Sequence, residues 1–447
     1  MDKKIQYDSL NDILNYKVSD MLPFLAGILF VCAEASRTVL RFIIPSFLSR
    51  EWLIYAVQDG VILILSFLSI VISIPYARKK NRIWPVYVFV FGSILFSILF
   101  YPEYNDWFHH QTYGLSLLFF HMTSAIFGFL IFSLFYDKKK IITMLLYACR
   151  INVFYHMYEY SEFIQRGYFL ANNAQGELIQ QDYGLNFGYR VVISLIFFLV
   201  LFVYNKKIID LIFCIVSFLI VLLAGSRGAF VCIGSAVLLL YFFSWKHIRN
   251  QKKLFLRMIF LIILLIIIFH NYTFILNELI RLLEKSNISG RIIQMLLNGT
   301  ITNDSGREGI YSIALEMIRH FKPFGYGFYG DRYVIGRNYY WGYPHNLFLE
   351  LLIQYGVILG GFLILILLFN IIRMIIQCND KSWQLLLITM LCSSMKLMLS
   401  DSFWYYWPFW ALIAILGLWN KEQNDTKKHI LSNAEKMARI QVQSNQF

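Results

Sequence analysis

Charged residues are scarce in this 447-residue chain, at 15% of the total, whereas hydrophobic residues make up 58%. A soluble chain of this length would carry roughly 25% charged residues. The shortage therefore excludes an ordinary soluble domain. A cleavable signal peptide is not expected either, because the N-terminal stretch is polar and mixed in charge and an apolar span follows it directly.

Several kinds of chemistry lack the residues they need. The loops expected outside the membrane contain no Asp-x-Asp pair and no His/Cys cluster, so a divalent metal has no evident ligands. The six cysteines do not have metal-site spacing, and we expect them to be small core residues rather than disulfides or ligands. A Walker A motif, which ATP-driven transport would use, is missing, and no serine-protease triad is visible. We therefore expect no metal and no other cofactor.

What the chain does have is apolar blocks suited to a hydrocarbon core, which needs ~20 residues per helix. The clearest are 61–77, 84–100, 114–135, 191–203, 208–224, 229–243, 254–269 and 357–376. Aromatic residues beside the shorter blocks complete the span. The blocks predict an all-α polytopic membrane protein that forms one integral membrane domain over residues 1–447.

Basic runs alternate with acidic, mixed or neutral intervals along the chain. The runs are 78–82, 138–140, 206–207, 246–253, 373–381 and the tail from 421 onward. With a cytoplasmic N-terminus, about twelve transmembrane helices place every basic run inside. The net charge of +13 then reflects topology rather than nucleic-acid binding. Residues 420–447 become a cytoplasmic tail, and the segments left outside are the loop after Tyr158, the turn 225–228, the interval of about 270–345 and the turn around Asp401.

A few charged residues lie within or at the ends of the apolar runs, where such residues usually face the bundle interior and mark a functional cavity. In the first predicted span, roughly residues 21–48, Glu34, Arg37 and Arg41 share one helical face and can pair locally. The others are Asp59, Arg150, Arg190 and Lys396. Snorkelling or a structural ion pair is the alternative explanation for each of them.

The long outer interval, 270–345, contains an amphipathic helix predicted over residues 308–321. Its apolar face consists of Ile310, Ile313, Ala314, Met317 and Phe321. Lys322-Pro323 ends the helix, and a turn-rich aromatic loop, 324–330, follows. We expect this helix to lie along the outer membrane surface and cover a cavity.

Arginines occupy outer positions that suit an anionic ligand. Arg227 lies in Gly225-Ser226-Arg227-Gly228, where the glycines allow a sharp turn and close approach of a ligand. A guanidinium group also matches the oxygens of a phosphate. A Ser-Gly-Arg triplet ends at both Arg291 and Arg307, and Arg307 begins the amphipathic helix, where the helix dipole favours a nearby anion. The alternatives are snorkelling to lipid head groups for Arg227 and a solvated loop position for the other two.

His345 precedes the last long apolar block. A neutral imidazole can accept the proton of an attacking hydroxyl. Pro344 restricts the backbone before it, and Asn346 is suited to cap the helix that carries Glu350 inward. A polar residue at a helix start is the simpler alternative for His345.

These motifs occur in an order that resembles the C-terminal region of the O-antigen ligase/polymerase superfamily, over about 191–399. The matching features are Gly225-Ser226-Arg227-Gly228, Arg307 and its helix, Pro323-Phe324-Gly325-Tyr326-Gly327, His345-Asn346, Glu350, Gly356 and Gly360. The segment 182–188 departs from the family pattern, because it lacks the proline that many members have there.

The resemblance implies a metal-independent glycosyltransferase with a GT-C-like helical bundle and one long extracytoplasmic loop. Such enzymes move a glycan from an undecaprenyl diphosphate carrier to a sugar hydroxyl outside the cytoplasmic membrane. Arg227 and Arg307 match the arginines that hold the donor diphosphate, and His345 matches the base. Looser counterparts predict that Arg291 and Arg190 bind substrate, and we expect the same of Glu350 and Asn346.

The predicted function is that of a Wzy-type polymerase, which joins lipid-linked repeat units into a capsule, exopolysaccharide or O-antigen. The expected location is the bacterial cytoplasmic membrane, and the expected partners are the lipid-linked oligosaccharide, the bilayer, and the flippase and chain-length regulator of the same pathway, without nucleic acid. A ligase with another acceptor is the nearest alternative. A flippase would instead use the intramembrane charges as a path, although no inverted repeat is visible.

Overall fold

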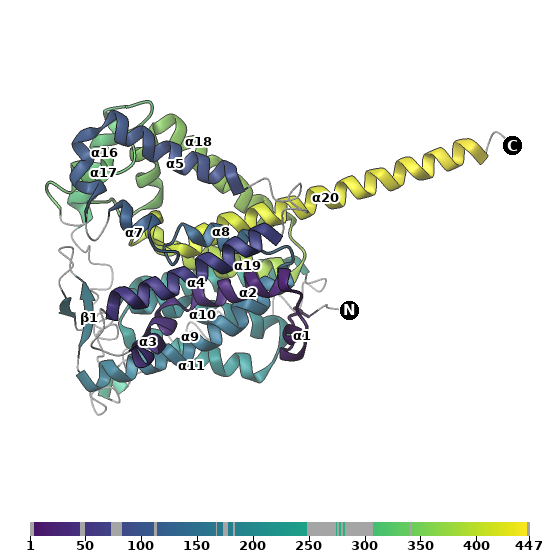
Figure 1. Cartoon of the computed structure of the whole chain (residues 1–447), viewed down its shortest axis with the longest axis horizontal. Helices are drawn as coiled ribbons and strands as arrows, with labels where there is room; N and C mark the ends of the chain where they lie inside the picture. The colour runs from purple at the N-terminus through teal and green to yellow at the C-terminus, as the bar shows by residue number, and fades with distance from the viewer. Residues whose placement is uncertain are drawn as a thin grey trace.

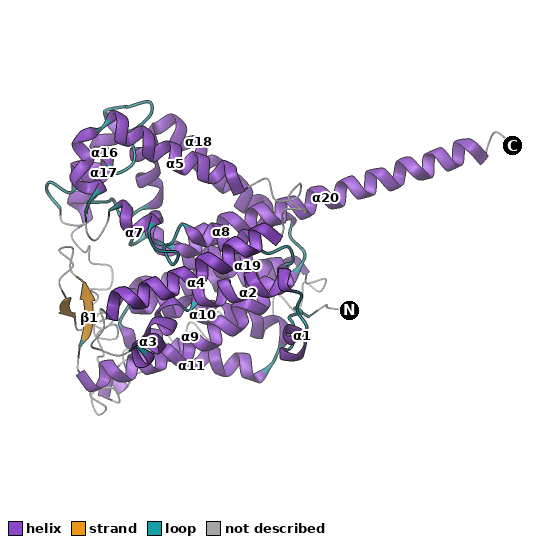
Figure 2. Ribbon diagram, in the orientation of Figure 1, coloured by secondary structure: helices purple, strands orange, loops and turns teal. Residues whose placement is uncertain are grey.

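Helices form almost all of the structure, because a helix satisfies its own backbone hydrogen bonds within a bilayer (Figure 2). The structure is a computed structural model that describes residues 4–44, 50–72, 83–110, 114–166, 168–172, 178–181, 184–247, 307–339 and 342–444, and isolated positions between 274 and 281. The predicted block 254–269 lies outside these residues.

The elements follow one another along the chain as shown in Figure 1. They are α1 (Leu10–Leu14), α2 (Val18–Val31), α3 (Ala33–Ile43), α4 (Arg50–Ile72), α5 (Ile83–Phe100), η2 (Pro102–Tyr104), α6 (Asn105–Phe108), α7 (Leu115–Phe119), α8 (Phe127–Ser133), α9 (Lys138–Arg166), β1 (Phe169–Asn172), β2 (Leu178–Gln181), α10 (Leu185–Asn205), α11 (Ile208–Ala224), α12 (Arg227–His247), α16 (Arg307–Arg319), α17 (Gly330–Ile335), α18 (Leu347–Gln377), α19 (Lys381–Ser394), η3 (Met395–Met398), η4 (Phe403–Tyr405) and α20 (Trp407–Ser444).

Among the described residues, four helices are long and apolar enough to cross a membrane, or up to six if two bent helix pairs each count as one span. The four are Trp52–Ile72, Asn186–Asn205, Arg227–Lys246 and Leu347–Gln377. The protein is therefore a membrane protein, as its composition predicts. The predicted total of about twelve spans is larger than this set.

α10 forms the centre of the bundle. It packs against α9, α11, α12 and α19, and 72% of its apolar window is buried within the protein. The corresponding value is 28% for both Trp52–Ile72 and Arg227–Lys246, which leaves most of those helices facing lipid. Segments at the ends of α10 are therefore held by packing on several sides.

Two predicted spans differ from straight helices. The chain bends by 85° between α2 and α3, so the charged face of α3, which includes the Glu34–Arg37 ion pair of 2.5 Å, does not continue the axis of α2. The block 114–135 is divided into α7 and α8. Polar groups explain this second break, because the Ser124 hydroxyl donates to the Leu117 carbonyl at 2.5 Å and His121 bonds Asp59 at 2.7 Å.

The prediction of an all-α fold needs one correction. β1 and β2 pair antiparallel in the segment between α9 and α10, with Phe169 opposite Gln181. The segment connects the ends of two neighbouring helices, and a short hairpin satisfies its backbone groups locally. The remaining described elements are helical.

Described residues of several basic runs gather at one end of the bundle, which we call the basic end. There the Lys138 ammonium bonds Asp380 at 2.8 Å and Glu422 at 2.7 Å, and Lys139 bonds Asp8 at 2.5 Å. Ile5 in the N-terminal segment donates to the side chain of Asn205 at the end of α10. This gathering agrees with the predicted positive-inside arrangement.

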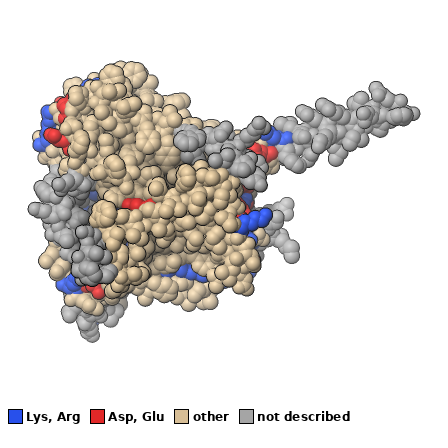
Figure 3. All heavy atoms as spheres, viewed as in Figure 1, with Lys and Arg blue, Asp and Glu red and all other residues tan. Residues whose placement is uncertain are grey.

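The cysteine prediction is confirmed, since all six cysteines are free and buried. The predicted tail continues α20, which extends away from the bundle toward the C-terminus (Figure 1). On the face shown in Figure 3, most of the described surface is uncharged, and lysine and arginine side chains gather mainly toward its two ends. A broad uncharged surface between polar ends is typical of a protein embedded in a bilayer.

Candidate active site

The site end, opposite the basic end, begins with the turn between α11 and α12. Gly225 adopts a left-handed conformation, with φ of 76°, and ends α11, so Arg227 becomes the first residue of α12. A Cβ atom at Gly228 would collide with the hydroxyl of Tyr189, which comes from α10. Glycine is therefore needed at 228 for the tyrosine to approach. The turn thus brings Arg227 and Tyr189 together.

The three predicted catalytic residues share charged and polar neighbours at this end. The charges of Arg227, Arg307 and Asp401 act on the Tyr189 hydroxyl. Arg307 and Asp401 also act on the His345 imidazole. Residues 227, 307 and 345 are far apart in sequence, and Arg307 and Asp401 link them, because both act on Tyr189 beside Arg227 and on His345.

α16 carries Arg307 as its first residue, as the sequence predicts. Its buried residues Ile310, Ala314 and Met317 pack with Ile335 and Ile353 of α17 and α18. The prediction that Phe321 belongs to this apolar face is wrong. The helix ends at Arg319, and Phe321 is 56% exposed with a left-handed φ of 40°.

The aromatic loop after α16 fits a kink in α18. Gly356 has φ of 76° and ψ of 167°, which interrupts the helix and frees the carbonyl groups of the preceding turn. Tyr326 and Gly327 donate their backbone N–H groups to Ile353 and Gln354, at 2.8 and 3.0 Å. A Cβ at Gly325 would meet the backbone of Gly356. Gly325 and Gly356 are therefore both required for the close backbone contact between the aromatic loop and α18.

His345 is held in a constrained and buried position. Its φ is 51°, which few non-glycine residues adopt, and only 8% of its surface is exposed. Its ring lies 4.4 Å from that of Tyr343, and Nδ1 has no hydrogen-bond partner among the described residues. As predicted, Asn346 caps α18, since its side-chain oxygen accepts from the N–H groups of Phe348 and Leu349. A strained, buried imidazole at a helix start is a candidate functional group.

The electrostatic surroundings keep His345 neutral. Burial lowers the pKa of its imidazole to about 4, and the nearby Arg307 cation lowers it further in the same direction. Asp401 opposes this shift, and Arg332 adds to it. At neutral pH the imidazole is therefore unprotonated and able to accept a proton.

A buried ion network that the sequence did not indicate lies close to His345. Arg332 is fully buried, and Nη1 donates to Asp331 at 2.8 Å and to Glu350 at 3.2 Å. Nη2 donates to the hydroxyl of Ser402 at 2.8 Å. Gln354 also donates to Asp331, at 3.0 Å. The network joins α17, α18 and the segment before η4.

Arg332 and Asp331, which are neighbours in α17, stabilise each other's charged forms. Burial disfavours the Arg332 cation, but Asp331 and Glu350 outweigh burial and raise the pKa of the guanidinium well above its usual value. Burial raises the pKa of the Asp331 carboxyl, and the Arg332 charge limits that rise. Arg332 also lies 5.5 Å from the ring of Tyr343, which in turn contacts His345.

A second ion pair borders the site. The ammonium of Lys396 lies 2.7 Å from Asp401 and 5.0 Å from the centre of the Tyr189 ring. It also donates to Asn186 at 3.4 Å. Lys396 is only 5% exposed, so this cation belongs to the interior of the site end.

The remaining predicted residues occupy different places. Arg190 follows Tyr189 on α10 but forms an ion pair with Glu159 of α9, and Glu350 is fully buried with Arg332. Substrate contact by these two residues stays a prediction, and Arg291 lies outside the described residues. Within the described ranges, no group of three or more His, Cys, Asp or Glu side chains is arranged to hold a metal ion.

The residues that border the site differ in how far the sequence indicated them. Lys396 is a charge in an apolar run, which usually marks an interior site. Arg332 follows Asp331 in a region rich in aromatic residues, and adjacent opposite charges are too common to single out. Tyr189 is one of 29 tyrosines, so composition offers no way to select it.

A family model described as O-antigen ligase matches residues 212–366. The matched segment contains Arg227, Arg307, His345 and Glu350, and it excludes Tyr189, Lys396 and Asp401. No curated protein and no solved structure matches the chain. Residues 212–366 are thus similar to the O-antigen ligase family, in agreement with the resemblance that the sequence motifs predict.

Proposed function

We propose that the protein polymerises undecaprenyl-diphosphate-linked oligosaccharide repeat units into a surface polysaccharide on the outer face of the cytoplasmic membrane. The observation that carries the proposal is that Arg307 and Asp401 act both on Tyr189, which Arg227 also affects, and on His345. The match of residues 212–366 to the O-antigen ligase family model supports glycosyl transfer of the ligase or polymerase type. The donor, the acceptor and the independence from metal are parts of the proposal.

In the proposed reaction, a sugar hydroxyl of one repeat unit attacks the anomeric carbon of another. A new carbon–oxygen bond forms, the bond between that carbon and the diphosphate breaks, and the hydroxyl proton passes to His345. The lipid diphosphate leaves with the bonding electrons. Arg227 and Arg307 hold its oxygens as negative charge develops, which is the task that guanidinium groups perform well in a partly dry site.

The low pKa of His345 fits this sequence of events. In the empty site the imidazole is neutral, because burial and the Arg307 cation disfavour its protonation. A bound diphosphate adds about two negative charges and offsets that cation, so the imidazole becomes a stronger base when the donor is present. Base strength then rises only when there is a substrate to activate.

The fold proposed for the whole chain is a GT-C-like bundle of about twelve spans with a long outer loop. The four to six spans of the described residues form part of it. The undecaprenyl chain would stay in lipid while its diphosphate reaches the site end. The flippase and the chain-length regulator of the same pathway are the proposed partners.

A ligase that transfers the glycan to another acceptor is the second candidate, because the matching family model is described as O-antigen ligase. The flippase alternative has less support. Three of the four charged residues that would line its transport path are engaged in separate side-chain pairs. These are Asp59 with His121, Arg190 with Glu159 and Lys396 with Asp401.

The direct test is turnover by the purified protein of a lipid-linked repeat unit, followed by separation of the products by size. A ladder of multiples of the repeat supports polymerisation, whereas transfer to an added acceptor without a ladder supports ligation. Arg227→Ala and His345→Ala should lose the product. Arg319→Ala, an exposed arginine at the far end of α16, serves as the matched control and should behave like the unaltered protein. Absence of turnover with intact, folded protein contradicts both enzyme assignments.

A further inference from the structure

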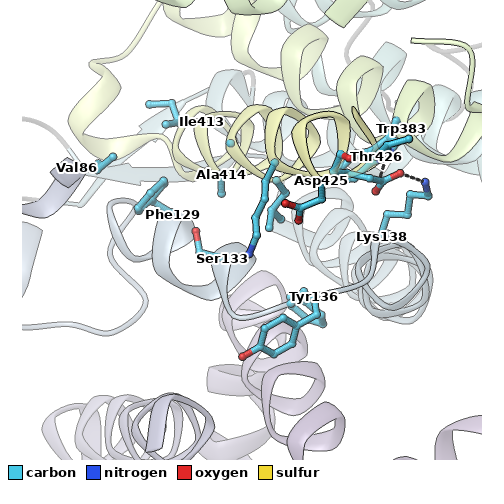
Figure 4. Close-up of a pocket in the computed structure, with 15 residues that line it drawn as sticks. Val86, Phe129, Ser133, Tyr136, Lys138, Trp383, Ile413, Ala414, Asp425 and Thr426 are labelled. Carbon is cyan, nitrogen blue, oxygen red and sulfur yellow. Dashed lines mark hydrogen bonds and ion pairs between the residues drawn. The ribbon is translucent and has the colours of Figure 1, made fainter. Parts of the chain in front are cut away.

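A cavity of about 550 Å³ lies at the basic end, remote from the histidine and the arginines of the site end. It is bordered by α20, α8, the connection from α8 to α9, and Trp383 of α19, as Figure 4 shows. The volume lies within the range of small-molecule and cofactor sites, roughly 300–1,000 Å³. Nothing in the proposed glycan transfer uses this cavity.

One part of the cavity is apolar. Val86, Phe129, Ile413, Ala414 and Leu418 line it. An apolar recess of this size does not hold water well and takes up apolar groups instead, which a membrane protein meets as the hydrocarbon of the surrounding lipid. An acyl chain is therefore the natural occupant of this part.

The other part is charged and carries both signs. Lys138 and Lys421 line it together with Glu422 and Asp425. Both oxygens of Glu422 are engaged, one by the Lys138 ammonium at 2.7 Å and the other by the indole N–H of Trp383 at 3.1 Å. Asp425 projects from α20 toward the wall that carries Ser133 (Figure 4). The mouth therefore carries two ammonium groups and two carboxylates, without an excess of positive charge.

Gly417 keeps the apolar part open. It lies within the long helix α20, where glycine is less favourable than alanine. No described atom lies within 4 Å of a Cβ atom built at this position, so packing between helices does not require glycine here. The missing side chain leaves space that belongs to the cavity.

We propose that the cavity binds one zwitterionic phospholipid that bears a primary ammonium group, from the leaflet at the basic end. Its acyl chain lies along Gly417 and the apolar wall. Its ammonium donates to Asp425, and its phosphate lies beside Lys421. A purely anionic head group would place its charge next to two carboxylates, and a choline head group has no N–H to donate.

The test is the lipid retained by the full-length protein. The protein is reconstituted in vesicles with equal amounts of phosphatidylethanolamine, phosphatidylglycerol and phosphatidylcholine, extracted in mild detergent and examined by native mass spectrometry. We expect one retained phosphatidylethanolamine per chain. Gly417→Phe should reduce its retention by about tenfold, equivalent to about 1.4 kcal/mol of binding free energy. Gly361→Phe is the control, because a Cβ there also meets no described atom within 4 Å and Gly361 does not line the cavity.

A second pair of variants tests the head group. Asp425→Asn should abolish the preference for phosphatidylethanolamine over phosphatidylglycerol and leave the total lipid retained nearly unchanged. Asp20→Asn removes a carboxylate of the basic end that does not line the cavity, and it should keep the preference. Undiminished retention by a folded Gly417→Phe variant would overturn the site. Equal or greater retention of phosphatidylglycerol or phosphatidylcholine by the unaltered protein would overturn the head-group assignment.

Discussion

The two ends of the bundle use charged residues in different ways. At the basic end, the side chains of Lys138 and Asp380 are 22% and 44% exposed, and water shares in their ion pair. At the site end, the side chains of Arg332, Asp331 and Glu350 are completely buried. Exposed pairs contribute little to stability, whereas a buried ion that loses its partner is costly. The charges of the basic end are thus partly solvated, whereas those of the site end are part of the interior.

The largest effect should come from breaking the buried network. Arg332→Ala leaves Asp331 and Glu350 unpaired in the interior, and we expect the free energy of unfolding to fall by about 3–5 kcal/mol. Thermal unfolding can be followed with a thiol-reactive fluorophore, because all six cysteines are buried and free. Adding Asp331→Asn and Glu350→Gln to Arg332→Met removes the uncompensated charges and should recover much of the loss. Equal stability of Arg332→Ala and the unaltered protein would show that the network is dispensable.

Arg307→Ala should affect the reaction rather than the fold. Removing one of two cations that hold the leaving diphosphate is expected to slow turnover by about 10²–10³-fold, or about 2.7–4 kcal/mol in the barrier. The measurement is the initial rate of product formation from a lipid-linked repeat unit. Arg319→Ala, on the same helix, should retain the full rate. A comparable loss in both variants would point to disruption of α16 instead.

The pH dependence of stability distinguishes His345 from an exposed histidine. Its pKa is about 4 in the folded protein and about 6.5 when unfolded, so the folded state disfavours its protonation. The stability from the neutral form is full above pH 6.5 and is lost as the pH falls toward 4, by about 3 kcal/mol in all.

His345→Gln should therefore lose less stability than the unaltered protein across this interval, as measured by unfolding midpoints between pH 7 and 4. His320, whose side chain is 69% exposed, provides the control. His320→Gln should follow the curve of the unaltered protein. Identical curves for all three proteins would show that His345 is not buried in the neutral form.

The smallest effect is expected at the basic end. Lys138→Ala removes the exposed ion pairs with Asp380 and Glu422 and should lower the free energy of unfolding by less than about 1 kcal/mol per pair. Added salt should reduce this difference further, whereas the effect of Arg332→Ala should persist in salt. Similar salt dependence in the two variants would remove the contrast between the two ends.

Much of the site's composition could be predicted from the sequence, but its arrangement could not. Arg227, Arg307 and His345 were found because each stands beside a glycine turn or a helix start next to an apolar run. Their approach to Tyr189 depends on how α10 packs against the turn before α12, which local pattern does not contain. Glu350 was expected to face substrate, and its burial with Arg332 follows from contacts among α17, α18 and the segment before η4.

The fold, like the site, could be predicted from the sequence in some parts and not in others. The apolar block 357–376 begins directly after Gly356, where the structure interrupts α18, so hydropathy located this boundary well. The block 114–135 is equally apolar but forms two short helices, because Ser124 bonds the backbone and His121 bonds Asp59 of another helix. Hydropathy reports the solvent that a segment prefers and does not report such partners.

The sequence alone determined that the chain lies in a membrane, and it singled out Arg227, Arg307 and His345 as candidates for one site. These are consequences of residue type and local order along the chain. Tertiary structure decided which charges are buried, which glycines are needed and which tyrosine lies near Arg227 and Arg307. Burial and close approach depend on segments far apart in the chain, so no local pattern contains them.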